Sequence, residues 1–244
     1  MTSVDGKLTG LRGLTAVLRC YVAHPGILLY LVPNALLVTW LVVNRNLVHF
    51  GWFAAGFIGF LPQEYLTHRY ILHFKAPANK LAYRFLYRAH YGHHEFPKRI
   101  DLMWIPVWLT VPLLVVNVAL FAPIARTPAN TLASLSGLFT GYLLFEWCHL
   151  LCHVPLRLSS RFVASMRARH LWHHYRNEHY WYSVQQVAWP FDAVSQTSGA
   201  PLKVPPSNTS FSLGIEKSDP RVEAARQSFA AKSTGTIERS EIWL

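Results

Sequence analysis

The sequence has 244 residues, of which 52% are hydrophobic and only 14% are Lys, Arg, Asp or Glu. A soluble domain carries roughly a quarter charged residues, so this composition argues against an ordinary soluble protein and favours a membrane protein. The net charge of +11 would also suit a nucleic-acid-binding protein. The cations, however, lie between long apolar runs, which favours contact with a membrane surface and argues against a nucleic-acid partner.

Four apolar runs are long enough, or nearly so, to cross the ~30 Å hydrocarbon core as helices that rise ~1.5 Å per residue. They cover residues 27–43, 47–74, 102–125 and 131–154. Only "NRN" separates the first pair and "RTPAN" the second, which predicts two tight antiparallel helical hairpins. The first run is the shortest and contains Pro33 and Asn34, so a kinked hairpin that does not fully cross stays an alternative.

Lys and Arg residues concentrate before the first run, between the second and third, and after the fourth, whereas the other side has Arg45 and Arg126 alone. The positive-inside rule therefore predicts that both termini and the long middle segment are cytoplasmic. No secretory signal peptide is expected. Polar residues dominate after position 198, which favours disorder. We thus expect a cytoplasmic N-terminal segment (1–25), a membrane domain (26–197) and a polar, disordered tail (198–244).

Ten of the thirteen histidines fall in four motifs on the predicted cytoplasmic side. The motifs are "HRYILH" (His68, His73), "HYGHH" (His90, His93, His94), "HLLCH" (His149, His153) and "HLWHH" (His170, His173, His174). A single histidine at a membrane interface, such as His24 or His49, is ordinary. Four motifs on one side of one membrane domain predict metal ligation instead.

The spacing of the motifs predicts how the rings face. Positions i, i+3 and i+4 lie within roughly 100° of arc on an α-helix, so we expect the three rings of each HxxHH motif to face one point. His149 and His153 have the i, i+4 spacing by which two imidazoles on one helix bind one metal. His68 and His73, at i and i+5, lie about 140° apart on a regular helix, so either a local distortion or two separate ions is required.

Ten imidazoles exceed the roughly four to six ligands of one first-row ion, which favours a dinuclear site. Imidazole binds zinc, copper, iron and nickel alike, so the ligand type does not identify the element. Two dications among neutral ligands need negative charge nearby, and Glu64 and Glu146 are candidates to supply it. The alternative is that these carboxylates face the basic cytoplasmic surface. Cys148 and Cys152 flank ligand positions, and we expect them to be small buried residues.

Together with "EYLTHRYILHF", "EWCHLLCH" and "RHLWHHYRNEHYW", the four motifs resemble the histidine boxes of the fatty acid hydroxylase and sterol desaturase superfamily. They are most similar to the fatty acid 2-hydroxylase branch, over about residues 25 to 197. The resemblance implies an all-α, integral membrane four-helix domain under a cytoplasmic helical cap that holds a di-iron centre. It places the ligands at the ten histidines named above and implies no catalytic side chain separate from the metal centre.

By this resemblance the protein is an iron-dependent monooxygenase that uses O2 to hydroxylate a C–H bond of a lipid or fatty acyl chain. Some relatives carry a fused b5-type cytochrome, which the 23 residues before His24 cannot form. We therefore expect a separate electron donor, a ferredoxin or a b5-type cytochrome with its reductase. The sequence departs from the family where Ser183 replaces a common glycine and where Trp189 and Asp192 are not adjacent.

Two alternatives stay open. A desaturase, or a hydroxylase of a sterol or carotenoid, would use the same site, because the outcome depends on the shape of the lipid channel. A metal transporter or a haem electron carrier would be a different class. Transport sites usually lie near the bilayer midplane and bis-histidine haem requires facing helices within the hydrocarbon, whereas these histidines are expected at one surface.

Overall fold

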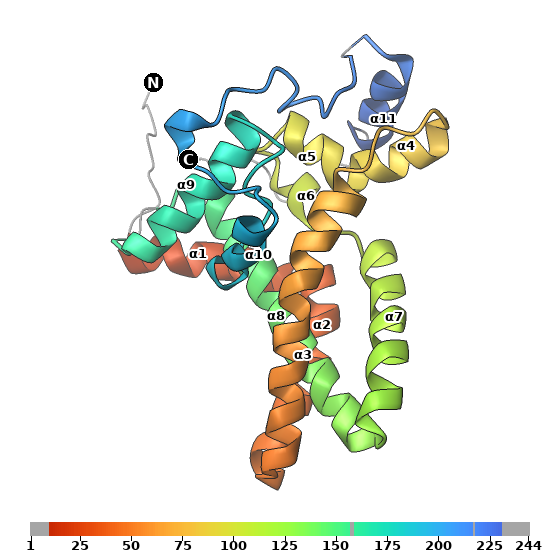
Figure 1. The fold of residues 1–244 in the computed structure, drawn as a ribbon, viewed down its shortest axis with the longest axis vertical. Helices are drawn as coiled ribbons and strands as arrows, with labels where there is room; N and C mark the ends of the chain where they lie inside the picture. The colour runs from red at the N-terminus through yellow and green to blue at the C-terminus, as the bar shows by residue number, and fades with distance from the viewer. Residues whose placement is uncertain (1–9, 157–158, 217, 231–244) are drawn as a thin grey trace.

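The computed structural model describes residues 10–156, 159–216 and 218–230. These residues form helices and loops without a strand among them, which confirms the predicted all-helical fold. Four long helices run along the molecule and the shorter ones gather at one end (Figure 1). The long helices are α2 (Pro25–Asn44), α3 (Leu47–Leu66), α7 (Val107–Ala125) and α8 (Pro128–His153). The shorter ones are α1 (Gly10–Ala23), α4 (Lys80–Leu86), α5 (Gly92–Glu95), α6 (Ile100–Met103), α9 (Arg161–Tyr175), α10 (Trp189–Val194) and α11 (Pro220–Ala230).

Three stretches are long and apolar enough to cross a membrane: Pro25–Asn44, Ile100–Ala125 and Pro128–His153. Pro33 lies inside α2 without ending it. The fourth predicted pass, α3, also has 20 residues, but it contains His49, Gln63 and Glu64 and is not among these three stretches. Its crossing of the membrane therefore stays a prediction.

Both predicted tight turns are present, and local interactions account for them. Arg45 ends α2 in the left-handed conformation (φ 48°), and the side chain of Asn46 then accepts a hydrogen bond from Val48 N at 2.9 Å. Arg126 ends α7 in the same way (φ 63°), and the side chain of Thr127 accepts from Asn130 N at 3.2 Å. A left-handed residue that closes one helix and a polar cap that starts the next permit such a short reversal.

Helix α8 is the centre of the bundle, because α2, α3 and α7 all pack against it. Its contact with α3 is a direct approach of two backbones. A Cβ added to Gly56 would lie 1.8 Å from the carbonyl oxygen of Ser134, and one added to Gly137 would lie 1.9 Å from that of Phe53. Only glycine fits at such a crossing. The crossing fixes the relative positions of two helices that lead into histidine motifs.

The segment from residue 199 to 230 differs from the expected disordered tail. It crosses the end of α9, where Ser207 N donates to Arg176 O at 2.7 Å, and it ends in α11. One face of α11 packs against α4 and the helical turn that follows it, in a small second core formed by Val222, Ala225 and Phe229 with Tyr83, Tyr87 and Tyr91. The apolar positions i, i+3 and i+7 in an otherwise polar sequence are the signal for this face. Residues 231–244 lie outside the described part of the chain.

Candidate metal centre

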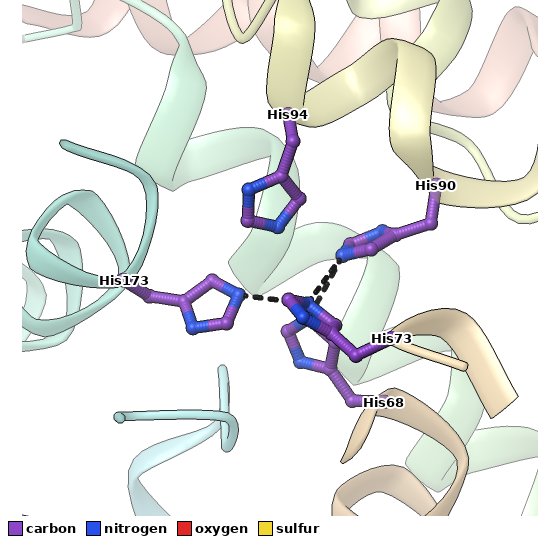
Figure 2. A group of neighbouring side chains, drawn as sticks. All are labelled: His68, His73, His90, His94 and His173. Carbon is purple, nitrogen blue, oxygen red and sulfur yellow. Dashed lines mark hydrogen bonds between the residues drawn. The ribbon is translucent and has the colours of Figure 1, made fainter. Parts of the chain in front are cut away.

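The ten histidines of the four motifs come together in two adjoining groups of five. The first set is His68, His73, His90, His94 and His173, and the second set is His93, His149, His153, His170 and His174. Within each set, one ring nitrogen of each residue lies within 4.8 Å of the corresponding atom of every other. Figure 2 shows the five rings of the first set converging from separate segments of the chain. The two sets meet where the ring centroids of His94 and His174 are 4.2 Å apart.

Each HxxHH motif divides between the two sets, so the expectation that its three rings face one point is wrong. His90 and His94 belong to the first set and His93 to the second, whereas His173 belongs to the first set and its two partners to the second. Positions i and i+4 are only about 40° apart on a helix, but i+3 and i+4 are about 100° apart. Each motif can therefore give two ligands to one centre and one to its neighbour.

A local distortion brings the i, i+5 pair together. The segment after α3 is a π-helix, η1 (Thr67–Leu72), and His73 N donates to His68 O at 3.1 Å. Because the i→i+5 bonds of a π-helix bring residues five apart onto one face, both rings reach the first set. A second π-helical turn, η2 (Tyr87–Tyr91), leads into α5 and the second motif. Of the two explanations left open by the sequence, the structure has the distortion.

The spacing of the ring nitrogens fits a metal ion in each set. Two nitrogens about 2.1 Å from one ion and separated by a tetrahedral or octahedral angle lie roughly 3.0–3.4 Å apart. In the first set the Nε2–Nε2 distances are 3.0 Å for His68–His90, 3.1 Å for His73–His90 and 3.2 Å for His73–His173. In the second they are 3.0 Å for His93–His149, 2.8 Å for His153–His170 and 3.1 Å for His170–His174. His94 Nε2 is buried and has no partner among the described residues.

Burial keeps these rings in the form that binds metals. Removal from water lowers the pKa of His94 to about 3. Burial and, to a lesser degree, the neighbouring imidazoles lower the pKa of His90, His170 and His174 well below the usual value. A metal binds the unprotonated ring, which is the form that these histidines have at neutral pH.

Three histidines of the first set are oriented by backbone carbonyls. His68 Nδ1 donates to Tyr182 O at 2.5 Å, His173 Nδ1 to Tyr180 O at 2.7 Å, and His94 Nδ1 to Ser210 O at 2.8 Å. A proton fixed on Nδ1 leaves the Nε2 lone pair free to face the centre. All three carbonyls belong to the chain after the last histidine motif.

Glu64 and Glu146 lie in the interior and in neither histidine set. Glu64 accepts from Val184 N at 2.6 Å, from Gln185 N at 2.9 Å and from Gln185 Nε2 at 2.8 Å. Glu146 accepts from Ile105 N and from Tyr142 OH, each at 3.0 Å. Neither faces the basic surface. Glu64 instead ties α3 to the segment whose Tyr182 carbonyl orients His68.

An apolar cavity lies between α2, α3, α7 and α8, and His68 is the member of the two sets that lines it. Four polar residues of its wall pair with each other: Tyr30 OH donates to Thr110 Oγ1 at 2.5 Å, and Asn117 Nδ2 to Gln63 Oε1 at 3.0 Å. Glu64 and Tyr142 also line it and bond to Val184 N and to Glu146, respectively. The remaining wall is mainly hydrocarbon, from Phe60, Leu72, Ile105, Leu113, Leu114, Leu138 and Phe145. Such a cavity suits an apolar chain that reaches the first set.

Fold and site together define a helical membrane protein with ten clustered imidazoles at one end. The family model described as fatty acid hydroxylase matches residues 53–197, and the chain belongs to this family. The fatty acid 2-hydroxylase of Rattus norvegicus is 26% identical over 155 residues, which cover 62% of this chain and 40% of that protein. The enzyme of the same name from Mus musculus is 24% identical over 148 residues, or 59% and 39% of the two chains.

A solved structure described as full-length Scs7p, with only the hydroxylase domain visible, has a similar fold. Its TM-score is 0.60 and its sequence identity 26%, over 80% of this chain and 67% of that one. The chain therefore spans about two fifths of the length of the curated relatives and most of the visible hydroxylase domain.

Sequence reasoning missed the residues that hold the segment after the last motif. Asp192 accepts from Tyr182 N at 2.9 Å and from Ser183 N at 3.0 Å, and it is fully buried. Gln185 and Ser210 also contribute through the bonds described above. The departures at Ser183 and Asp192 mark this segment in the sequence, but they do not reveal that it braces the histidines.

Proposed function

We propose that the protein hydroxylates a C–H bond of a lipid or fatty acyl chain at two iron ions held by the two histidine sets. The observation that carries this proposal is the position of His68, which belongs to the first set and also lines the apolar cavity. One atom of O2 enters the C–H bond as a hydroxyl group. The other leaves as water after the uptake of two electrons and two protons.

The ten histidines would act as ligands, and no side chain would serve as a nucleophile. Iron supplies the activation of O2 when it is bound, and the imidazoles of all ten residues supply neutral nitrogen donors for it. The backbone carbonyls of Tyr180, Tyr182 and Ser210 keep three of these rings in the tautomer that presents Nε2. Glu64 acts at a distance, by fixing the chain at Val184 and Gln185.

The cavity would bind the acyl chain and keep water from it. Tyr30 and Thr110, and Gln63 and Asn117, pair with each other, and Glu64 and Tyr142 have partners of their own, so the wall offers mainly dispersion contacts to a substrate. A flexible hydrocarbon chain fits this wall better than a ligand that needs hydrogen bonds. The names of the rat and mouse relatives make carbon 2 of a fatty acyl chain the first position to examine.

The proposed topology has four membrane passes, with both termini and the histidine sets in the cytoplasm. Cations flank the ends of the helices near the histidines, whereas the opposite turns carry Arg45 and Arg126. Electrons would reach this side from a separate ferredoxin or b5-type cytochrome with its reductase. A desaturase would use the same centre, so the product must be measured. A transporter is disfavoured because the sets draw their histidines from the end of α8 and from the shorter elements η1 (with His73 directly after it), η2, α5 and α9, and not from the middle of the long helices.

The test is a lipid profile by mass spectrometry of cells with and without the gene, beside metal analysis of the purified protein. We expect lipid species heavier by one oxygen and iron bound to the protein. Species lighter by two hydrogens would identify a desaturase instead. Unchanged lipids, with a Soret band or metal uptake by vesicles that contain the protein, would contradict the proposal.

A further inference from the structure

The chain from Val204 to Ala230, here named the C-terminal clasp, contacts the HYGHH motif at His94 and at the following residue, Glu95. We propose that the clasp positions His94, so that metal retention in the first set depends on it more strongly than retention in the second set does. The inference rests on the proposed metal centre. Under this inference the two metal positions differ in how strongly they retain their ion, and residues of the clasp cause the difference.

The two sets differ in how their outer ring nitrogens are held. In the first set, the Nδ1 atoms of His68, His94 and His173 donate to backbone carbonyls. In the second set, four Nδ1 atoms are buried without a partner among the described residues: those of His93, His149, His170 and His174. Hydrogen bonds to the outer nitrogen of a ligand typically change metal affinity by about 10–100-fold. In the second set His153 has a backbone partner at Pro97. The affinity of the first position therefore depends more strongly on the surrounding chain than that of the second.

His94 is the ligand that most needs external support. It lies one residue before the end of the continuous helical run formed by α4, η2 and α5, and the last turn of a helix frays most readily. Its Nδ1 bonds to Ser210 O in the clasp at 2.8 Å, 116 positions away in sequence. The second set, in contrast, draws four of its five ligands from α8 and α9, which have 26 and 15 residues, and only His93 comes from α5.

The residue after His94 gives the clasp a second contact. Glu95 forms an ion pair with Arg226 of α11 and accepts from Tyr87 OH at 2.9 Å. The Glu95 side chain is 12% exposed and that of Arg226 is 30% exposed, so water screens this pair less than an exposed one. Stacking of the Tyr87 and Phe229 rings, with centroids 6.1 Å apart, places α11 beside this pair.

The clasp is fixed at both ends, which lets it orient the motif. Arg176 Nε donates to Val204 O at 2.8 Å, and Asn177 Nδ2 donates to Pro205 O at 3.0 Å, just after α9. At the other end Arg221 Nη1 donates to Pro77 O at 2.6 Å, just before α4. The clasp thus joins the segment that follows His173 to the segment that precedes His90, and both of these histidines belong to the first set.

The experiment follows zinc release from the full-length protein to a coloured chelator, with zinc as a redox-silent ion that imidazole binds well. We expect two phases in the wild type, assigned with His173→Ala, which lacks a first-set ligand, and His170→Ala, which lacks a second-set ligand. Arg226→Met and Glu95→Gln should each speed the first-set phase by about 10–100-fold and the second-set phase by clearly less, since the second set has one residue, His93, on this turn. The double variant should be no faster than either single variant, because one ion pair is lost in all three.

Gln227→Ala is the matched control, since this exposed residue of α11 bonds only to Glu223 in the described structure. It should release zinc like the wild type. A chain that ends after Pro206 removes Ser210 and α11 together and should show the largest effect. Equal acceleration of both phases, or of neither, overturns the proposal.

Hydrogen–deuterium exchange of residues 90–96 in the metal-free protein gives a readout that needs no metal. Exchange should be faster in Arg226→Met than in Gln227→Ala, and equal exchange in the two variants overturns the proposal. If the wild type binds no zinc or iron while exchange still differs, the clasp braces the motif but the proposed metal function fails. The two failures are thereby distinguishable.

Discussion

Gly56 of α3 lies so close to Ser134 of α8 that a Cβ at position 56 would be 1.8 Å from the Ser134 carbonyl oxygen. Gly56→Ala must therefore push the two helices apart. We expect a loss of about 1–3 kcal/mol in the free energy of unfolding, as for other overpacked contacts. Bound metal should decrease as well, because α3 leads into His68 while α8 carries His149. Thermal unfolding and metal analysis of the purified variant provide the measurements.

Gly51→Ala on the same helix is the control, since an added Cβ there meets nothing within 4 Å. It should be neutral or slightly stabilising, because alanine favours a helix over glycine by up to about 1 kcal/mol. If Gly51→Ala and Gly56→Ala destabilised the protein equally, the close crossing of α3 and α8 would not be the cause of the loss at position 56.

His93 and His94 are neighbours in sequence but belong to different sets. His93→Ala should therefore weaken the second metal position and His94→Ala the first, so that each variant retains about one ion where the wild type binds two. The double variant should retain none. Metal content per chain is the measurement. If either single variant lost both ions and remained folded, the ten histidines would form one inseparable site.

Glu64 accepts three hydrogen bonds from Val184 and Gln185, and it is only 4% exposed. Glu64→Gln replaces an acceptor oxygen by a donor opposite N–H groups, which should cost about 1–3 kcal/mol of unfolding free energy. The first set should lose affinity, because Tyr182 O follows any shift of this segment and orients His68. Melting temperature and metal affinity check this. Glu216→Gln, at an exposed position, should leave both unchanged.

The metal-free protein should lose stability on acidification through its buried imidazoles. Burial lowers the pKa of His94 to about 3, whereas an imidazole in an unfolded chain has a pKa near 6.5. Between these values the unfolded chain binds more protons, so this ring's contribution to the unfolding free energy falls as the pH falls from about 6.5 toward about 3.

His94→Gln isolates this contribution, because glutamine does not titrate. Over that range the variant's unfolding free energy should depend on pH less steeply than that of the wild type, by up to about 1.36 kcal/mol per pH unit. Unfolding of chelator-treated proteins at about pH 7, 6 and 5 measures the difference. Parallel pH profiles would mean that His94 titrates normally in the folded protein.

Periodicity and spacing were sufficient to predict the helical fold, the two tight turns and the ten histidines that meet. Periodicity and spacing did not predict which of the two histidine sets each ring of an HxxHH motif belongs to. The division of His93 from His94 depends on where α8 and α9 stand relative to α5, and a single motif does not contain that information. The π-helical turn at His68 is an intermediate case, because the i, i+5 spacing required a distortion or a second ion without choosing between them.

The C-terminal segment was the largest surprise. Its composition predicted disorder, yet Val222, Ala225 and Phe229 form an apolar face that packs on tyrosines of α4 and η2. The carbonyl of Ser210 carries no sequence signal, since any residue with the same backbone geometry could supply it. Asp192 and Gln185 likewise act on backbone atoms, so their role becomes visible only in three dimensions.

In the proposed reaction, the protein with iron held by its two histidine sets inserts one atom of O2 into a lipid chain. The most direct measurement supplies the purified, iron-loaded protein with a fatty acyl lipid, reducing equivalents and oxygen-18 gas, and analyses the lipid by mass spectrometry. We expect a hydroxylated product that carries one oxygen-18 atom. The His93→Ala, His94→Ala double variant should not form this product. A product without the isotope, or one that has only lost two hydrogens, would contradict the proposed reaction.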